Sequence, residues 1–334
     1  PKKIQKIVDE IDKILLQKEY LFLNTSYDLT IVEENKIDVK FKFKDLDQFY
    51  VEKINIFGNF ITEEKVIRNS LIVDEGDAFN KVLFSKSINS IKSRGIFKSV
   101  KSSVSDSVGD SQKKIVNITV EEKPTGEIFA GAGTGTSGAT VTAGLKEKNY
   151  LGKGISLSTN LTISEDEIKG KFSVVNPNFK NTDRSLNTTL ESTSSDFLST
   201  GGFKTSRTGF ALGTGFEQYS DFYVNLDVST YYEKLETSSE ASDYKKKQEG
   251  DYLENLLSYR LTLNKLDQNF QPTDGHKVSF KQVLPLYSDD LSIENTLNLS
   301  KYYSITDNLI LSGKFFFKTV NSIDDDVRVS RRIY

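Results

Sequence analysis

The chain has 334 residues, a formal net charge of −3 and a single histidine. This balance of charge provides no basic surplus for nucleic-acid binding. Cysteine is absent, which excludes disulfides, thiol chemistry and cysteine-based metal sites. A cysteine-free chain also suits an oxidising compartment such as the periplasm.

The chain contains no methionine and opens at Pro1 inside a helical pattern. We therefore expect an internal fragment of a longer protein, with any secretion signal upstream. No apolar run approaches the ~20 residues that a membrane-spanning helix requires. If the protein crosses a membrane, strands must do so.

Helix and strand patterns alternate in the first part of the chain. Strand patterns over 21–32 and 36–44 follow an initial amphipathic helix. The same order returns about 78 residues later, with Ile37 and Ile115 in equivalent places. The apolar positions of the initial helix are Ile4, Ile7, Ile11, Ile14 and Leu15.

We interpret this repeat as a tandem of small α+β modules. Residues 1–48 form the C-terminal part of one module, and residues 49–123 form a complete second module. The order expected in the complete module is strand, helix, helix, strand, strand. Its predicted features are a strand over 51–57, a short helix with Thr62 as N-cap, a helix over 80–93 that ends at Gly95, and strands over 97–105 and 114–122.

Residues 124–334 lack helical periodicity and contain about eleven strand-like segments. Several segments alternate apolar and polar residues, as a soluble β-sandwich, a β-helix or a transmembrane barrel would. Segment lengths of roughly 9–14 residues and a long polar connection at 236–251 favour the barrel. Aromatic residues near strand ends predict interfacial girdles: Tyr150, Phe179, Phe197, Tyr219, Tyr231, Tyr232, Tyr302 and Tyr303.

Short motifs across the chain resemble the BamA family of outer-membrane β-barrel assembly factors. The most specific is Glu-Lys-Pro-Thr-Gly-Glu at 122–127, which is similar to the family's passage from its last POTRA module to its first barrel strand. Further matches are Ile-Asn-Ile-Phe-Gly-Asn at 54–59, Glu-Gly-Asp-Ala-Phe-Asn at 75–80, Asn-Tyr-Leu-Gly-Lys-Gly at 149–154, Asn-Pro-Asn-Phe at 176–179 and Asp267 with Pro-Thr-Asp-Gly at 272–275.

The resemblance implies α+β POTRA modules followed by an all-β antiparallel transmembrane β-barrel, with about 11 of its 16 strands in this chain. It implies a location in the bacterial outer membrane, with the POTRA modules in the periplasm. The implied function is the assembly and insertion of β-barrel proteins. The implied partners are unfolded outer-membrane protein precursors, accessory lipoproteins of the assembly complex and outer-membrane lipid. The family's Arg-Gly-Phe signature is expected beyond Tyr334.

The first barrel strand is the main candidate site. Gly131, Gly133 and Gly135 weaken this strand, because glycine lowers strand stability. One explanation is tight backbone packing in the barrel wall. The resemblance implies another, a strand edge that opens laterally and receives client strands. The residues of this client edge are Ile128, Phe129, Ala130, Gly131, Ala132, Gly133, Thr134 and Gly135.

Four arginines form a second candidate group. Arg207 and Arg260 lie on the polar faces of their strands, so in a barrel we expect them to point into the lumen. Arg331 and Arg332 begin the long loop that, by resemblance, enters the lumen.

We expect no catalytic, cofactor or metal site, and no enzyme. Gly133 to Gly138 fits G-x-G-x-x-G, but a strand follows where a nucleotide site needs a helix. His276 has no second histidine or cysteine as partner, and the aspartates at 324–326 lack calcium-loop spacing. The rivals to the assembly function are a two-partner secretion type polypeptide transporter of the same superfamily, a passive porin or adhesin, and a hydrolase embedded in the barrel.

Overall fold

The computed structural model of the chain contains two compact units, Pro1–Pro124 and Thr125–Tyr334. The structure describes residues 2–17, 23–33, 36–45, 49–135, 138–268, 271–289, 291–306, 309–323 and 326–332.

The first unit begins with helix α1 (Lys2–Gln17) and the antiparallel strands β1 (Leu23–Glu33) and β2 (Lys36–Asp45). These elements agree with the predicted helix and two strands. Val8 of α1 is buried, whereas Ile7 and Ile14 remain about half exposed. A two-stranded sheet offers too little apolar surface to cover a whole helix face.

The complete module consists of β3 (Tyr50–Phe57), α2 (Glu64–Arg68), α3 (Lys81–Ser93), β4 (Phe97–Asp106) and β5 (Lys113–Glu122). The predicted order of strand, helix, helix, strand, strand is confirmed. The sheet order is β3-β5-β4, in which β3 runs parallel and β4 antiparallel to β5.

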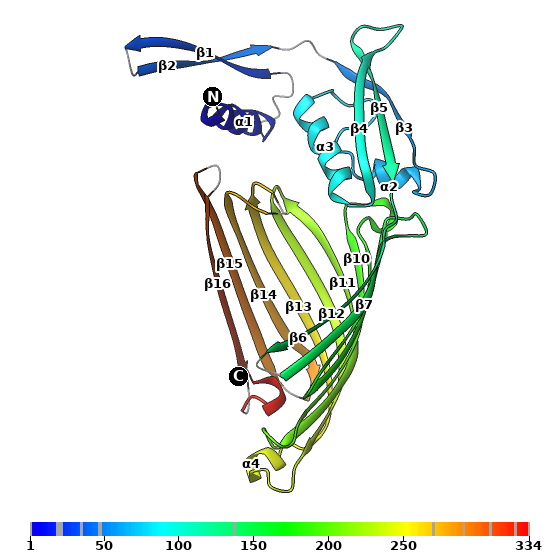
Figure 1. Ribbon diagram of the computed structural model, residues 1–334, viewed down its shortest axis with the longest axis vertical. Helices are drawn as coiled ribbons and strands as arrows, with labels where there is room; N and C mark the ends of the chain where they lie inside the picture. Colours follow the sequence, from blue (N-terminus) through cyan, green and yellow to red (C-terminus); the bar gives the residue numbers. More distant parts are fainter. Residues whose placement is uncertain are drawn as a thin grey trace. The chain divides into compact units, whose positions relative to one another are not determined.

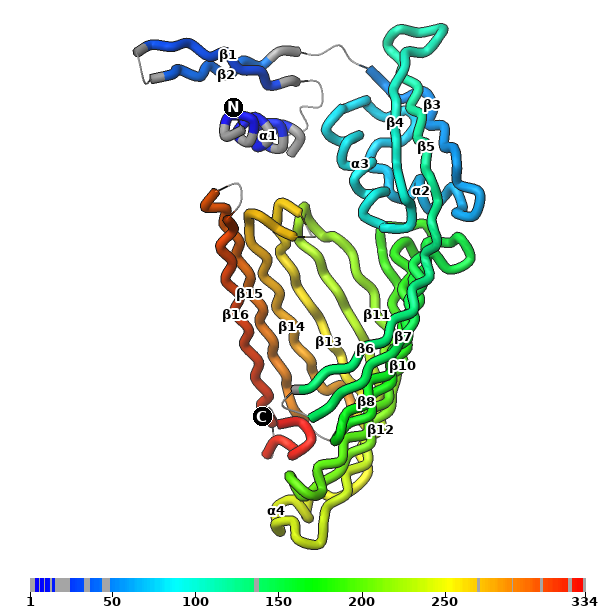
Figure 2. Tube along the Cα trace, in the orientation of Figure 1, coloured from blue at the N-terminus to red at the C-terminus, as the bar shows by residue number. Residues whose placement is uncertain are grey.

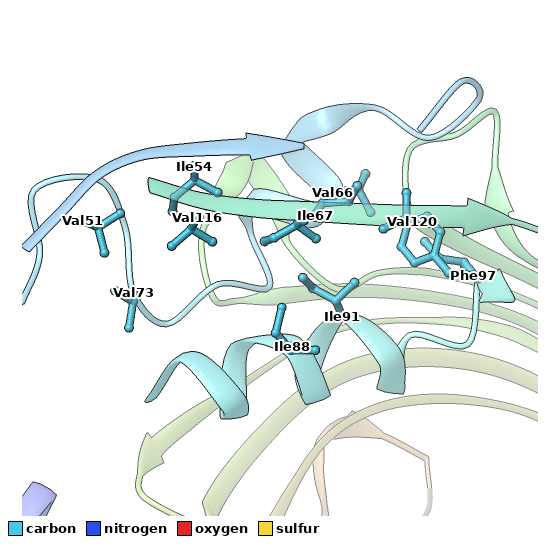
Figure 3. Close-up of a cluster of buried hydrophobic side chains, with 12 residues drawn as sticks. Val51, Ile54, Val66, Ile67, Val73, Ile88, Ile91, Phe97, Val116 and Val120 are labelled. Carbon is cyan, nitrogen blue, oxygen red and sulfur yellow. The ribbon is translucent and has the colours of Figure 1, made fainter. Parts of the chain in front are cut away.

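The core of this module lies between helix α3 and the sheet (Figure 3). Helix α3 presents Ile88 and Ile91 on one face, and its N-cap Asn80 accepts hydrogen bonds from the backbone N–H groups of Val82 and Leu83. Gly95 has a φ of +67°, as a glycine that follows a helix end commonly does. The buried core residues are Val51, Ile54, Val66, Ile67, Val73, Ile88, Ile91, Ile96, Phe97, Val116, Ile118 and Val120.

The prediction that Thr62 caps the short helix is wrong. Helix α2 begins at Glu64, and Glu63 occupies the N-cap position without a side-chain cap. The backbone N–H of Thr62 instead donates to the carboxylate of Glu122 over 2.6 Å, and the N–H of Ile61 donates to the same carboxylate over 2.9 Å. This contact ties the loop before α2 to the end of β5, a relationship between residues 60 positions apart that helix propensity does not encode.

The second unit is a single antiparallel sheet in which each strand pairs with its neighbours in the sequence (Figures 1 and 2). Its strands have 10 to 17 residues, so the longest exceed the predicted 9–14. The eleven strands are β6 (Gly126–Gly135), β7 (Gly138–Tyr150), β8 (Ile155–Ser164), β9 (Glu167–Asn176), β10 (Ser185–Phe197), β11 (Phe203–Tyr219), β12 (Phe222–Thr237), β13 (Gly250–Leu266), β14 (Gly275–Ser288), β15 (Ser292–Thr306) and β16 (Leu309–Ser322).

Short helices occupy some connections of the second unit. They are the 3₁₀ helix η1 (Phe179–Asn181), helix α4 (Asp243–Lys246) in the predicted long polar connection, and the 3₁₀ helix η2 (Val329–Arg331) after β16. Over the whole described part of the chain, no helix combines the length and the apolar character needed to cross a bilayer.

The two faces of the large sheet differ in polarity. We call the face that contacts residues 326–332 the inner face and the opposite one the outer face. Large apolar side chains on the outer face are exposed, as Phe210, Leu212 and Val228 show at about 50%. A soluble β-sandwich would bury these side chains against a second sheet. Their exposure instead matches the lipid-facing surface of a membrane barrel.

Candidate functional site: an unpaired strand edge and an inner ion cluster

Strand β6 lies at one edge of the eleven-stranded sheet. It pairs with β7 from Gly126, opposite Glu147, to Gly135, opposite Gly138. Within the described residues no strand pairs with its other side. All eight residues of the predicted client edge, 128–135, therefore lie in a strand with a row of unpaired backbone N–H and C=O groups.

The side chains of β6 alternate between the two faces of the sheet. Ile128 lies opposite Leu145 on the outer face and is 86% exposed. The ring of Phe129 lies on the inner face, close over Gly144 of β7. The strand thus presents an apolar side to the outside and aligns its three glycines with Phe129 on the inner side.

Among the described residues, close packing does not explain Gly131 and Gly133. A methyl group added at Gly131 or Gly133 would meet no atom within 4 Å among the described residues. Glycine here removes side-chain contacts and increases the conformational freedom of the strand. The client-edge role of this strand remains a prediction.

The beginning of β6 is held more firmly than its glycine-rich end. Glu127 forms an ion pair of 2.7 Å with Lys148 of β7, and the Thr125 hydroxyl donates to Glu147. The backbone N–H of Lys148 also donates to the carbonyl of Thr125 over 3.3 Å. These contacts fix the strand where it enters the sheet.

A group of charged side chains, which we call the ion cluster, lies on the inner face near the end of the sheet that carries α4. Glu233 of β12 and Glu254 of β13 are each 1% exposed. Arg328 donates to Glu233 over 2.9 Å and also bonds Glu254. Arg331 and Arg207 bond Glu254 over 2.9 and 3.0 Å. Buried carboxylates require such partners, because an uncompensated buried charge is very costly.

Aromatic rings support the arginines of this cluster. The guanidinium of Arg207 lies 3.4 Å from the centre of the Tyr231 ring, and that of Arg328 lies 3.9 Å from the Tyr252 ring. Gly209 makes room for Tyr231, since a methyl group there would overlap this residue. The prediction that Tyr231 belongs to an interfacial girdle is therefore wrong. Its ring faces inward because Tyr231 shares the inner face of β12 with Asp227 and Glu233, and Gly209 leaves space for it.

An apolar contact completes the attachment of residues 326–332. Val329 is buried against Phe203 and Leu235. Its backbone N–H donates to the Gln248 side chain over 2.8 Å. The segment after β16 is thus held on strands β11 to β13 by both ionic and apolar contacts.

The structure places all four predicted arginines around one inner-face cavity. Arg207 and Arg331 belong to the ion cluster. Arg332 donates to the carbonyl of Val327 over 2.9 Å and to the hydroxyl of Tyr244. Arg260 lies further along β13, outside the cluster.

Three members of the ion cluster were not predicted from the sequence: Glu233, Glu254 and Arg328. A signal for the two carboxylates was present, because Glu233 continues the polar series of Asn225 and Asp227, and Glu254 that of Ser258. Strand alternation predicts an inner-face position for each. It does not predict that they share one arginine.

The remaining motifs do not form a further site. Gly133 and Gly138 lie in two antiparallel strands, β6 and β7. His276 is the second residue of β14. Asp324 and Asp325 lie outside the described residues, and within the described ranges no group of three or more potential metal ligands occurs.

Comparison with known proteins agrees with this architecture. The model of the Omp85 superfamily domain matches residues 149–334. The POTRA model, described as surface antigen variable number repeat, matches residues 49–123.

Two of the similar proteins are BamA proteins. The outer membrane protein assembly factor BamA of Neorickettsia risticii (strain Illinois) is 26% identical over 275 residues, which cover 80% of this chain and 36% of that protein. The crystal structure of BamA from Haemophilus ducreyi lacking POTRA domains 1–3 has a TM-score of 0.66 at 21% identity, covering 97% of this chain and 65% of that one. The chain thus spans about a third of the length of its BamA relative from Neorickettsia.

A further solved structure shares the fold at lower similarity. CdiB from Acinetobacter baumannii has a TM-score of 0.59 at 9% identity and covers 97% of this chain and 61% of that one. Both the TM-score and the identity are higher for BamA.

Proposed function

Because the chain belongs to the Omp85 superfamily, we propose that it assembles β-barrel proteins and inserts them into the bacterial outer membrane. The protein is located in this membrane, with its POTRA modules in the periplasm. The observation that carries the proposal is the glycine-rich strand β6 at the start of the large sheet, together with the similarity to BamA proteins.

The physical basis of the proposal is the cost of unpaired backbone in lipid. An N–H or C=O group without a partner in the hydrocarbon region costs several kcal/mol. An incoming strand that pairs with β6 satisfies its own backbone groups and those of the edge. The outer face of β6 is apolar at Ile128, so the paired client strand would lie in line with the lipid-facing surface of the sheet.

The glycines contribute freedom of movement. At Gly131 and Gly133 no side chain anchors the strand to a neighbour, and the space where a Cβ would lie is open among the described residues. The distal half of β6 can therefore adjust to client strands of different sequence. The ion pair of Glu127 with Lys148 keeps the other end in place. The free energy of client folding drives the process, which requires no enzymatic step and no cofactor.

The POTRA module offers a second strand edge. Residues 76–79 occupy part of the outer side of β3, where the N–H of Val51 donates to Asp77 and the N–H of Gly76 donates to the carbonyl of Val51. Within the described residues, no comparable contact covers the outer side of β4. We therefore assign the augmentation of extended client segments in the periplasm to β4. Accessory lipoproteins are further proposed partners.

Site-specific photo-crosslinking in the full-length protein tests the proposal. A photoreactive amino acid at Phe129 or Ala132 samples the inner and outer sides of β6, and the same amino acid at Leu212 is the control. Leu212 is about half exposed on the outer face but lies in the middle of the sheet. We expect adducts with several unfolded outer-membrane precursors at the two edge positions and none at Leu212.

The same experiment separates the assembly function from its main alternative. A two-partner secretion type transporter of the same superfamily is a candidate because CdiB shares the fold. Such a transporter would give adducts with one secreted polypeptide. Equal client adducts at Leu212 and at β6, or none at any position, would contradict the strand-edge mechanism.

A further inference from the structure

Two positively charged side chains face each other on the inner face, outside the ion cluster. Arg260 of β13 is the direct register partner of Lys281 of β14. Like charges in directly opposite positions destabilise an antiparallel pair. Neither side chain forms a salt bridge within 4.0 Å to any described residue. Among the described residues, the pair therefore has no carboxylate in direct contact.

The carboxylates on the adjacent strands β12 and β15 contact other groups. Glu294 of β15 forms an ion pair of 3.1 Å with Lys318 of β16. Asp227 of β12 accepts a hydrogen bond of 3.4 Å from Ser258 and lies close over the bare backbone of Gly213. Neither carboxylate forms an ion pair with Arg260 or Lys281.

Arg260 and Lys281 belong to the wall of an inner-face cavity of about 630 Å³. This volume is in the range of small-molecule sites. Among the described residues, the wall contains seven lysine or arginine side chains and three carboxylates. Arg331 and Arg332 enter the wall from the segment that the ion cluster attaches to the sheet.

We propose that this cavity binds a phosphate-type oxyanion, with Arg260 and Lys281 as its principal ligands. A guanidinium contacts an oxyanion through two parallel N–H groups, and an ammonium adds a compact point charge. Directly opposed strand residues have Cβ atoms ~4.5–5.5 Å apart, so one phosphate group reaches both side chains. A bound oxyanion offsets the repulsion between Arg260 and Lys281, and this explains why two cations occupy opposed positions.

The chemistry of the wall favours a soluble phosphate compound over a lipid. Ala211, Leu256 and Val283 are its few apolar members, too few to cover acyl chains. The apolar surface of the sheet lies on the other side, on the outer face. The phosphate group of an anionic lipid headgroup would nevertheless present the same chemistry, so the test includes both sources.

Titration calorimetry of the full-length protein in detergent micelles at low ionic strength tests this site. The two probes are inorganic pyrophosphate and dihexanoyl phosphatidic acid, a short-chain lipid. We expect Arg260→Gln and Lys281→Gln each to weaken pyrophosphate binding at least about tenfold, since each removes a charge-assisted hydrogen bond. Lys277→Gln is the matched control, because Lys277 lies in the same strand, carries the same charge and is outside the cavity wall.

The outcomes identify the source or overturn the site. Binding of pyrophosphate supports a soluble ligand, and binding of the lipid alone supports a headgroup. Binding of neither probe, or equal weakening by Lys277→Gln, overturns the proposal. Lys281→Glu tests it without loss of folding, since the new carboxylate pairs with Arg260. We expect this variant to melt at a higher temperature and to lose binding, and retained binding would contradict the site.

Discussion

Arg328 and Glu233 lie 95 positions apart in the sequence and are joined by a hydrogen bond of 2.9 Å on the inner face of the sheet. Both side chains are almost completely buried, and Arg328 also bonds Glu254. A contact of this kind fixes the chain after β16 to strands in the middle of the sheet. It also places Arg331 and Arg332 over the inner face, where they line the cavity.

Removal of Glu254 should release residues 326–332. Glu254→Ala leaves three arginines without their shared carboxylate, and the loss of one partner of a buried ion pair costs about 3–5 kcal/mol. We expect trypsin to cleave after Arg328 and Arg331 much faster than in the unmodified protein. Glu236→Ala is the control, because the exposed pair of Glu236 with Lys234 contributes little. Equal cleavage rates in the unmodified protein and Glu254→Ala would contradict the role of the cluster.

The arginines should differ in importance according to their burial. Arg328→Ala leaves Glu233 without its arginine, whereas Arg207→Ala leaves Glu254 with two others. The side chain of Arg207 is also 26% exposed, compared with 4% for Arg328. Hydrogen exchange of residues 326–332 should therefore accelerate strongly in Arg328→Ala and only slightly in Arg207→Ala. The reverse order would show that Arg207 is the main partner of the carboxylates.

Glu122 should make the POTRA module sensitive to acid. Partial burial alone would raise the pKa of Glu122, but hydrogen bonds from Thr62 and Ile61 outweigh it and hold the pKa below its usual value. A carboxylate with a depressed folded pKa stabilises the fold above its unfolded pKa of ~4.3, and this contribution disappears as the pH falls through the folded pKa.

We therefore expect Glu122→Gln to lower the stability of the module at pH 7 by about 1 kcal/mol, since Glu122 is largely solvated. The amides of Ile61 and Thr62 should exchange faster than in the unmodified protein compared at the same pH. This difference should shrink below about pH 4.3. The control is Glu121→Gln, which removes an exposed pair with Lys98. An effect of Glu122→Gln that does not depend on pH would contradict the explanation.

Gly58 should not tolerate a side chain. Its φ is +86°, and a methyl group would overlap the carbonyl oxygen of Val120. Strain of this kind costs about 1–3 kcal/mol, and the overlap adds to it. We expect Gly58→Ala to accelerate hydrogen exchange at the core residue Ile118. Gly109→Ala is the control, since a methyl group there meets no atom within 4 Å. Unchanged exchange in Gly58→Ala would show that the turn adapts.

The glycines of β6 should be dispensable for folding and important for assembly. A Cβ atom at Gly131 or Gly133 meets no atom within 4 Å among the described residues, and valine favours the extended backbone. We expect these variants to reach the membrane at normal levels but to slow the folding of outer-membrane precursors in a reconstituted assay. Ala130→Val adds similar bulk on the outer face of the same strand and should have a smaller effect. Normal assembly rates in the glycine variants would contradict the proposed role of strand flexibility.

The order and type of the elements follow from local sequence patterns. Apolar spacing of three and four residues predicted helix α1, and the alternation around Ile155 and Leu226 predicted strands with one apolar face. These patterns depend on the backbone geometry of a single segment. The resemblance carried by residues 122–127 then gave the fold class and the family. The eight edge residues were also proposed from local composition and this resemblance.

Contacts between side chains far apart in the sequence, in contrast, could be identified only from the folded chain. Thr62 does not cap helix α2. Its backbone N–H donates to the carboxylate of Glu122, because the end of β5 lies beside the loop before α2. Tyr231 turns inward over Gly209, and Arg328 finds Glu233 and Glu254 in strands far away in the sequence. Such contacts depend on strand register and on the path of the chain after β16. Alternation predicts on which face of the sheet a residue lies. Which residues of different strands come into contact on that face depends on the register in which the strands pair.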